Sequence, residues 1–163
     1  MSRLAVGGLI AALVATAAAT AIASTAAAPV TALNEVQWTY LERCGGCHGI
    51  QGSSAPSEVP SLRGQVGYFL CTPETRAYLI RLPSVATSPL SDRELAALMN
   101  FVVFDLGGAR ESDRFTDSEV RALRKRPLKD IDLTRYRAGL VERLIDNCAA
   151  PVSLRQYSAL QGQ

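Results

Sequence analysis

Two cysteines and a histidine near residue 45 have the types and spacing to do chemistry together. Cys44, Cys47 and His48 lie in the segment CGGCH, the C-x-x-C-H pattern of covalent c-type haem attachment. Residues three and four positions apart share one face of a helix. Both thiols can therefore add to the two vinyl groups of one haem, while the His48 imidazole is directed at the iron. The pattern predicts one covalently bound haem c, held by Cys44, Cys47 and His48.

Other uses of the paired cysteines explain less of the pattern. A zinc site would need a second ligand pair, and only Cys71 and Cys148 remain, as single cysteines. A thioredoxin-like C-x-x-C site follows a strand, whereas a helical pattern precedes this pair. A structural disulfide between Cys44 and Cys47 stays open, but it would not account for the adjacent histidine. That histidine is the only one in the chain, so any site that needs two histidines is excluded.

The composition of the 163-residue chain excludes several classes of function. Its 17 Lys and Arg residues nearly balance 15 Asp and Glu residues, for a net charge of +2. This balance argues against a nucleic-acid-binding protein and against a strongly acidic carrier. Four cysteines are too few for a disulfide-based scaffold. Nothing in the sequence resembles an acid–base pair, an activated serine or a metal-hydrolase cluster, so no enzyme is predicted.

Residues 1–28 have the pattern of a secretory signal peptide, with cleavage near residues 23–28. Arg3 precedes an uncharged run from Leu4 to Ala23, and small A-x-A patterns follow. The alternative is an uncleaved membrane anchor, because about 20 apolar residues can span a bilayer. Both interpretations export the rest of the chain, so we expect it in the periplasm, attached to the membrane only if the leader is uncleaved. The cysteines then meet an oxidising compartment.

Helical patterns recur along the exported chain, and no segment alternates convincingly with a period of two. The predicted fold class is therefore all-α. In the first part of this chain, helices are expected over residues 34–47, 72–82 and 92–106. Loops rich in glycine, serine and proline are expected over residues 49–64 and 83–90.

Two more helices and a polar tail are expected over residues 109–163. Thr116 and Glu119 form a capping box that opens a short helix ending before Pro127. Asp132 begins the last helix, whose apolar stripe consists of Leu133, Tyr136, Leu140, Leu144 and Cys148. The densest basic run of the chain is Arg121, Arg124, Lys125, Arg126 and Lys129. This run is either a solvated face or a docking surface for an acidic redox partner.

Over about residues 34–108, the sequence resembles the single-haem, class I type of c-type cytochrome. The resemblance implies a class I-like haem domain over residues 29–108, followed by a helical C-terminal extension over residues 109–163. It also assigns Pro60, which lies 12 residues after His48, as the residue whose carbonyl accepts a hydrogen bond from the imidazole. Such a contact orients the ring and raises its basicity.

The resemblance also implies roles for residues in the last helix of the haem domain. Phe101 corresponds to an aromatic residue that packs on the first helix, where Val36 and Tyr40 are its expected neighbours. Leu98 and Val102 are then expected to face the haem. Plain core packing of these five residues predicts nearly the same contacts.

The loop before that helix departs from the family pattern. Family members usually carry a methionine ligand there, but residues 83–89 contain no Met, His or Lys. Once Met1 is removed, Met99 is the only methionine, and it lies one position from Leu98. Met99 is therefore either the sixth iron ligand or a core filler. Otherwise the iron is five-coordinate or takes a backbone group, water or an amine, and an open position would permit small-ligand binding.

Five other residues have expected roles outside the motif. Cys71 and Cys148 are left over, and in an oxidising compartment they form either a disulfide or two free thiols. The disulfide would close a loop of about 77 residues and stabilise the fold by about 4 kcal/mol. Arg63 and Arg81 are candidate partners of the haem propionates. Trp38 is expected to pack as part of the first helix.

The predicted function is the transfer of single electrons between exported redox proteins, one acting as donor and the other as acceptor. Two alternatives stay open at this point. The missing loop methionine favours a haem-based sensor or gas-binding protein with an open sixth position. The additional helices favour a cytochrome subunit that docks onto an exported dehydrogenase.

Overall fold

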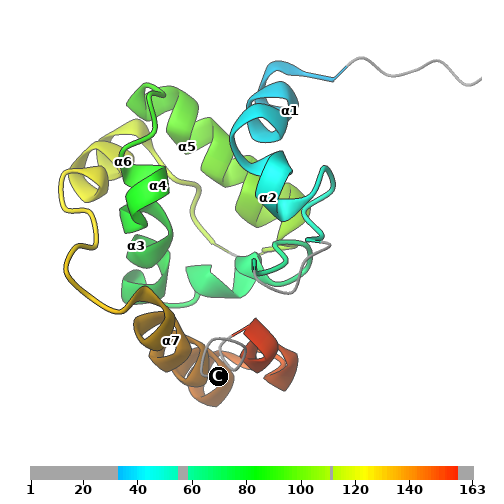
Figure 1. Cartoon of the computed structure of the whole chain (residues 1–163), viewed down its shortest axis with the longest axis vertical. Coiled ribbons are helices and arrows are strands. Elements are labelled where there is room, and N and C mark those ends of the chain that lie inside the picture. The colour runs from blue at the N-terminus through cyan, green and yellow to red at the C-terminus, as the bar shows by residue number, and fades with distance from the viewer. Residues whose placement is uncertain (1–32, 55–58, 111, 158–163) are drawn as a thin grey trace, which may run out of the picture. The chain divides into compact units, whose positions relative to one another are not determined.

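The computed structural model describes residues 33–54, 59–110 and 112–157, and these fold into helices joined by loops (Figure 1). The candidate signal peptide, residues 1–28, lies outside the described residues. Within the described residues there is no strand, so the predicted all-α class is confirmed. None of the helices in these ranges is both long and apolar enough to cross a membrane.

The first helical segment carries the CGGCH motif at its end. It consists of α1 (Glu35–Tyr40), the π-helical turn η1 (Leu41–Gly45) and α2 (Gly46–His48). Asn34 caps the start, because its side chain accepts a hydrogen bond from the Gln37 backbone at 2.9 Å. Gly49 ends the segment with a φ of 76°, and a Cβ there would collide with the carbonyl oxygen of Ser53. A glycine is therefore required directly after the histidine of the motif.

The middle of the chain contains one predicted helix and two short elements that the sequence analysis did not predict. The three elements are η2 (Val66–Leu70, 3₁₀), α3 (Pro73–Arg81) and α4 (Pro83–Ala86). Thr72 and Thr75 form the cap of α3. The expectation of a continuous loop over residues 83–90 is wrong, because Pro83 begins a helical turn as well as ending the previous one. Proline suits the first position of a helix, where its missing N–H costs nothing.

The next helical segment passes through the middle of the unit, between α1 on one side and α3, α4 and α6 on the other (Figure 1). It consists of α5 (Asp92–Asn100) and the π-helical turn η3 (Phe101–Leu106). The Phe101 ring meets the Tyr40 ring edge-on, with centroids 5.6 Å apart, and Tyr40 is buried. This contact joins α1 to η3. Trp38 also lies on α1 but is 57% exposed, so the expectation that it packs with the helix is wrong.

The C-terminal residues form three elements, which are α6 (Asp117–Arg124), α7 (Leu133–Cys148) and the 3₁₀ helix η4 (Val152–Tyr157). Leu140 and Leu144 of the predicted stripe are fully buried. The tail is not entirely polar surface, since Leu154 of η4 is only 1% exposed. The described residues belong to one compact unit, so the extension and the preceding helices share a core.

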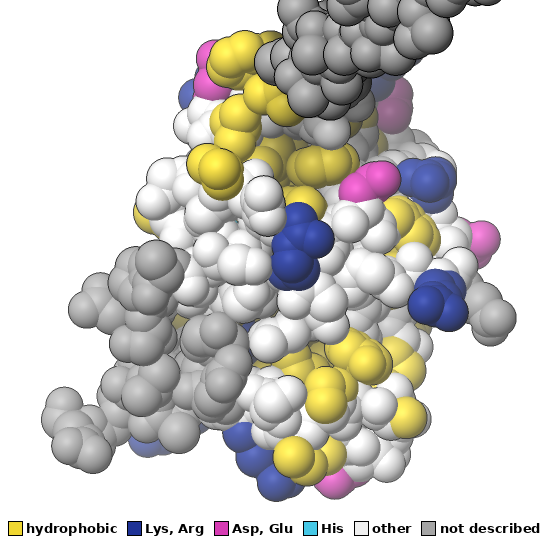
Figure 2. All heavy atoms as spheres, turned by 90° about the vertical axis from the view of Figure 1, so that its right-hand side faces the viewer, with side chains coloured by type: hydrophobic (Ala, Val, Ile, Leu, Met, Phe, Trp, Pro, Cys, Tyr) yellow, Lys and Arg dark blue, Asp and Glu magenta, His cyan; other side chains and the backbone are white. Residues whose placement is uncertain are grey.

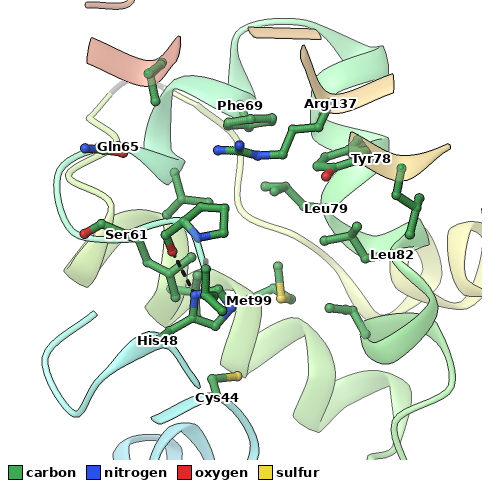
Figure 3. Close-up of a pocket in the computed structure, with 18 of the residues that line it drawn as sticks. Cys44, His48, Ser61, Gln65, Phe69, Tyr78, Leu79, Leu82, Met99 and Arg137 are labelled. Carbon is green, nitrogen blue, oxygen red and sulfur yellow. Dashed lines mark hydrogen bonds between the residues drawn. The ribbon is translucent and has the colours of Figure 1, made fainter. Parts of the chain in front are cut away.

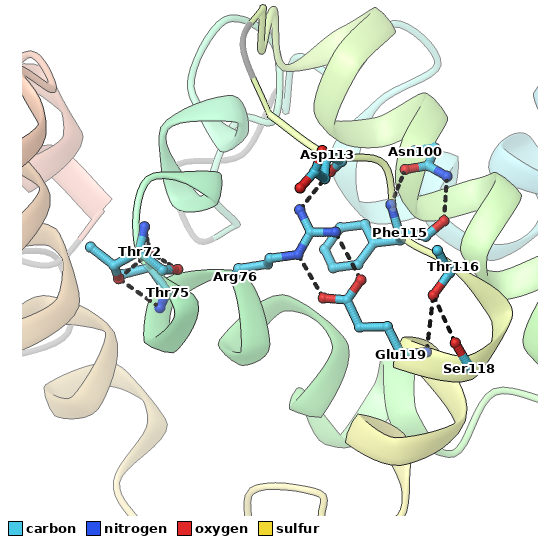
Figure 4. Close-up of polar contacts among 9 residues, drawn as sticks. All are labelled: Thr72, Thr75, Arg76, Asn100, Asp113, Phe115, Thr116, Ser118 and Glu119. Carbon is cyan, nitrogen blue, oxygen red and sulfur yellow. Dashed lines mark hydrogen bonds and ion pairs between the residues drawn. The ribbon is translucent and has the colours of Figure 1, made fainter.

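A polar cluster joins α6 to α3 (Figure 4). Arg76 donates two hydrogen bonds to the Glu119 carboxylate, at 2.6 and 2.8 Å, and a third to the backbone carbonyl of Asp113. The same guanidinium lies 4.0 Å from the centroid of the buried Phe115 ring. Asn100 in turn pairs with both backbone groups of Phe115. Thr116 caps α6, but the expected capping box is incomplete because Glu119 binds Arg76 instead.

Arg124 joins α6 to the segment before α5. Its guanidinium donates hydrogen bonds to three backbone carbonyls, those of Ala86, Ser88 and Leu90. It also reaches the Asp92 carboxylate, which Arg121 contacts as well. Only 17% of the Arg124 side chain is exposed, so this member of the basic run is part of the internal structure. On the face shown in Figure 2, charged side chains of both signs are scattered among hydrophobic ones.

A disulfide joins Cys71, directly after η2, to Cys148 at the end of α7, with sulfur atoms 2.09 Å apart. Aromatic and polar contacts support the same junction. The Tyr78 and Tyr136 rings lie 6.0 Å apart, and Glu74 accepts hydrogen bonds from Tyr136 and Arg143. These contacts hold α7 against η2 and α3.

Candidate functional site

A cavity of about 310 Å³ lies next to the CGGCH motif (Figure 3). The segment 59–62, η2, α3, α5 and α7 form its other walls, and most of its lining is hydrophobic. This volume is at the lower end of the range for small-molecule and cofactor sites, about 300–1,000 Å³. Cys44 and His48 both line the cavity, so the structure places two of the three predicted haem-binding residues at a hollow, whereas Cys47 does not line it.

The ring of His48 is fixed by a backbone contact. Its Nδ1 lies 2.9 Å from the carbonyl oxygen of Pro60, where the resemblance places such a contact. A carbonyl can only accept, so Nδ1 carries the hydrogen and Nε2 holds the lone pair of the neutral ring. Burial lowers the pKa of His48, opposed by the Pro60 contact and assisted by the charge of Arg137. The imidazole is therefore held neutral, the form that binds metals.

Cys44 and Cys47 are both free thiols, and they differ in exposure. Cys44 is half-buried and lines the cavity, whereas Cys47 is exposed. Burial, with a smaller contribution from Cys47, raises the pKa of Cys44 to about 11, so it is a neutral thiol at neutral pH. The structure does not contain the Cys44–Cys47 disulfide that the sequence left open.

A zinc site at Cys44 and Cys47 would have no further cysteine ligands in this structure. Cys71 and Cys148 are joined to each other, so neither is a thiolate that could bind zinc. Across residues 33–54, 59–110 and 112–157, no three His, Cys, Asp or Glu side chains are grouped to hold a metal ion by themselves.

Met99 and Val102 are the α5 and η3 residues that line the cavity. Leu98 is buried but does not line it, so the expectation that Leu98 faces this site is wrong. Successive helical residues are about 100° apart, which puts both Leu98 and Met99 within about 60° of Val102. The sequence therefore could not separate them. Figure 3 shows the Met99 side chain directed into the cavity near His48, and only 6% of the residue is exposed.

Leu79 of α3 and Leu82, which directly follows α3, lie across the cavity from His48 (Figure 3). Val85 of α4, within the loop where family members usually carry methionine, also lines the cavity. These three side chains have no atoms that bind iron, so this wall contributes apolar surface. An apolar wall excludes water and lowers the local dielectric constant, which affects a redox potential.

The polar groups of the cavity include residues that the sequence analysis missed. Arg137 lines it from α7, whereas the predicted Arg63 and Arg81 do not line it. Arg137 lies four positions after Leu133, the first residue of the apolar stripe, and this spacing was the available signal. Gln65 also lines the cavity, and its buried Oε1 has no hydrogen-bond partner. This oxygen can accept a hydrogen bond from a water molecule or a ligand in the cavity.

The residues present are chemically compatible with haem c. Two thiols three positions apart precede a neutral, oriented imidazole, and apolar side chains dominate the adjacent cavity. A thioether from Met99 and polar groups from Gln65 and Arg137 complete the lining. Neither a family model, nor a curated protein sequence, nor a solved structure matches this chain.

Proposed function

We propose that this protein is a single-haem c-type cytochrome of class I-like organisation that carries single electrons between redox proteins in the periplasm. The observation that supports this most strongly is the state of His48, which is neutral, fixed through Nδ1 by Pro60 and exposed to an apolar cavity. A satisfied core histidine would need no cavity beside it and no pair of free thiols on the same helix.

Each residue of the site has a defined role in this proposal. Cys44 and Cys47 form the two thioether bonds, and Pro60 keeps the hydrogen on Nδ1, so that Nε2 is the ligating atom. Leu79, Leu82 and the other apolar side chains exclude water. Haem iron, when bound, supplies the ferric–ferrous couple, while the protein sets its potential through ligands, burial and nearby charges.

Met99 is the described lining residue whose thioether could bind the iron of a bound haem besides His48. Its thioether is the kind of ligand that pairs with histidine in electron-carrying cytochromes, and it lines the same cavity as His48. The absence of a ligating side chain from residues 83–89 then reflects a ligand supplied by the helix instead of the loop.

A small-gas-binding protein is the second candidate, and the aliphatic wall opposite His48 favours it. Leu79 and Leu82 would surround an open position without closing it by coordination. The third interpretation is a cytochrome subunit that docks onto a dehydrogenase through the additional helices. It gains no specific support, because the buried faces of α6 and α7 pack against the rest of the same unit.

Absorption spectra test these proposals together. The exported protein is purified, and ferric, ferrous and ferrous carbon monoxide spectra are recorded for the wild type and for Met99→Leu. The electron-carrier proposal predicts a haem c spectrum that carbon monoxide does not alter in the wild type but does alter in M99L. A wild-type spectrum altered by carbon monoxide would favour the gas-binding protein, and a colourless protein would contradict both.

A further inference from the structure

The C-terminal extension forms one end of the cavity, although it lies outside the resemblance to known cytochromes. Leu133, Thr134 and Arg137 of α7 and Leu154 of η4 all line the cavity. Arg137 lies four positions after Leu133 and three after Thr134, so it is a neighbour of both on the surface of α7. The extension therefore contributes to the site as well as to the fold.

Arg137 is the residue that gives this end of the cavity its charge. Among the lining residues that the structure describes, it is the one Lys, Arg, Asp or Glu. Figure 3 shows its side chain extending from α7 into the cavity, between the Phe69 and Tyr78 side chains in that view. His48 and Tyr78, which belong to other walls, line the same cavity.

Gln65 adds a second polar group from a different element. It lies directly before η2 and lines the cavity, and its buried Oε1 has no hydrogen-bond partner. The oxygen and nitrogen of a glutamine amide can exchange places by rotation, so the same position can present a donor. A cation and an amide at a mostly apolar cavity suit a ligand that is mostly hydrophobic and carries carboxylates at one end.

The two arginines expected from the sequence lie outside the lining of the cavity. Arg63 donates from Nε to the carbonyl of Gln51 at 2.6 Å, and Arg81 donates from Nε to the carbonyl of Arg126 at 2.7 Å. Neither side chain lines the cavity. Of these three arginines, Arg137 is the one that lines the cavity.

We propose that Arg137 binds the carboxylates of the cofactor, so that the C-terminal extension completes the haem site. This inference rests on the function proposed above. It gives α7 a role in setting the redox potential, because a positive charge near the iron disfavours the ferric state. A guanidinium can bind a carboxylate through two parallel hydrogen bonds, which also fixes the orientation of the ligand.

The test compares midpoint potentials, measured by redox titration followed by absorption, for the purified holoproteins. The variants are Arg137→Gln and Arg137→Lys, with Arg135→Gln as the control, since Arg135 lies on the same turn with its side chain 90% exposed. We expect R137Q to have a lower midpoint potential and R137K to stay close to the wild type. The midpoint potential of R135Q should equal that of the wild type, because the charge of Arg135 is solvated and screened.

Each result decides between the inference and its alternatives. A wild-type protein without covalent haem would overturn the proposed function and the inference with it. A haem-containing wild type with an equal potential in R137Q would overturn the inference alone. If R137Q does not assemble but R137K does, a positive charge at this position is required, which supports the inference. If both fail to retain haem, Arg137 has a packing role and the inference is wrong.

Discussion

Replacing Arg124 by alanine should lower the free energy of unfolding by about 3 kcal/mol. The side chain donates hydrogen bonds to three carbonyls of the segment before α5, and only 17% of it is exposed. A hydrogen bond to a charged group contributes about 1.5–3 kcal/mol, and residual solvent access reduces the total for three. Val85, which lines the cavity, belongs to the same stretch of chain, so its wall should also loosen.

Urea denaturation followed by circular dichroism measures this change. With a slope of about 2 kcal/mol per molar urea, the midpoint should fall by about 1.5 M. Arg121→Gln is the matched control, because Arg121 contacts the same Asp92 but its side chain is 62% exposed. Its midpoint should change much less. Two results would refute the assigned role of Arg124. One is an equal decrease in the free energy of unfolding in R124A and R121Q, and the other is a decrease below about 0.5 kcal/mol in R124A.

Two further predictions concern the cysteines. Replacing Cys71 and Cys148 together by serine should lower the free energy of unfolding by about 4 kcal/mol, because the bond links residues 77 positions apart. Urea denaturation measures this decrease in the free energy of unfolding, and a decrease below about 1 kcal/mol would contradict the prediction. In the haem-free protein, iodoacetamide should modify the exposed Cys47 before Cys44, and the Cys44 rate should keep rising as the pH approaches the Cys44 pKa of about 11. Mass spectrometry follows both sites, and equal rates at pH 8 would contradict the burial of Cys44.

Helix starts could be predicted from the sequence because their caps are local. Ser91 and Thr72 each accept a hydrogen bond from the residue three positions later, as capping residues at helix starts do. The incomplete cap at Thr116 had a non-local cause. Glu119 binds Arg76, which is 43 positions away, and no local pattern reports such a partner.

The site could be predicted only where it depends on short spacing. The motif residues and the Pro60 contact lie within a short stretch of chain, and the structure brings His48 and Pro60 together. The polar end of the cavity escaped prediction, because Arg137 reaches the site through the packing of α7 on η2 and α3. The choice between Met99 and Leu98 required the actual rotation of α5, which hydrophobic periodicity does not fix.

The attachment of haem is the central claim, and extraction with acidified acetone tests it most directly. The wild-type protein and a Cys44→Ser, Cys47→Ser double variant are purified from cells that make c-type cytochromes. We predict that the wild-type pigment stays with the precipitated protein, since two thioether bonds hold it, and that any pigment in the double variant passes into the acetone. A colourless wild type, or wild-type pigment that passes into the acetone, would contradict the account.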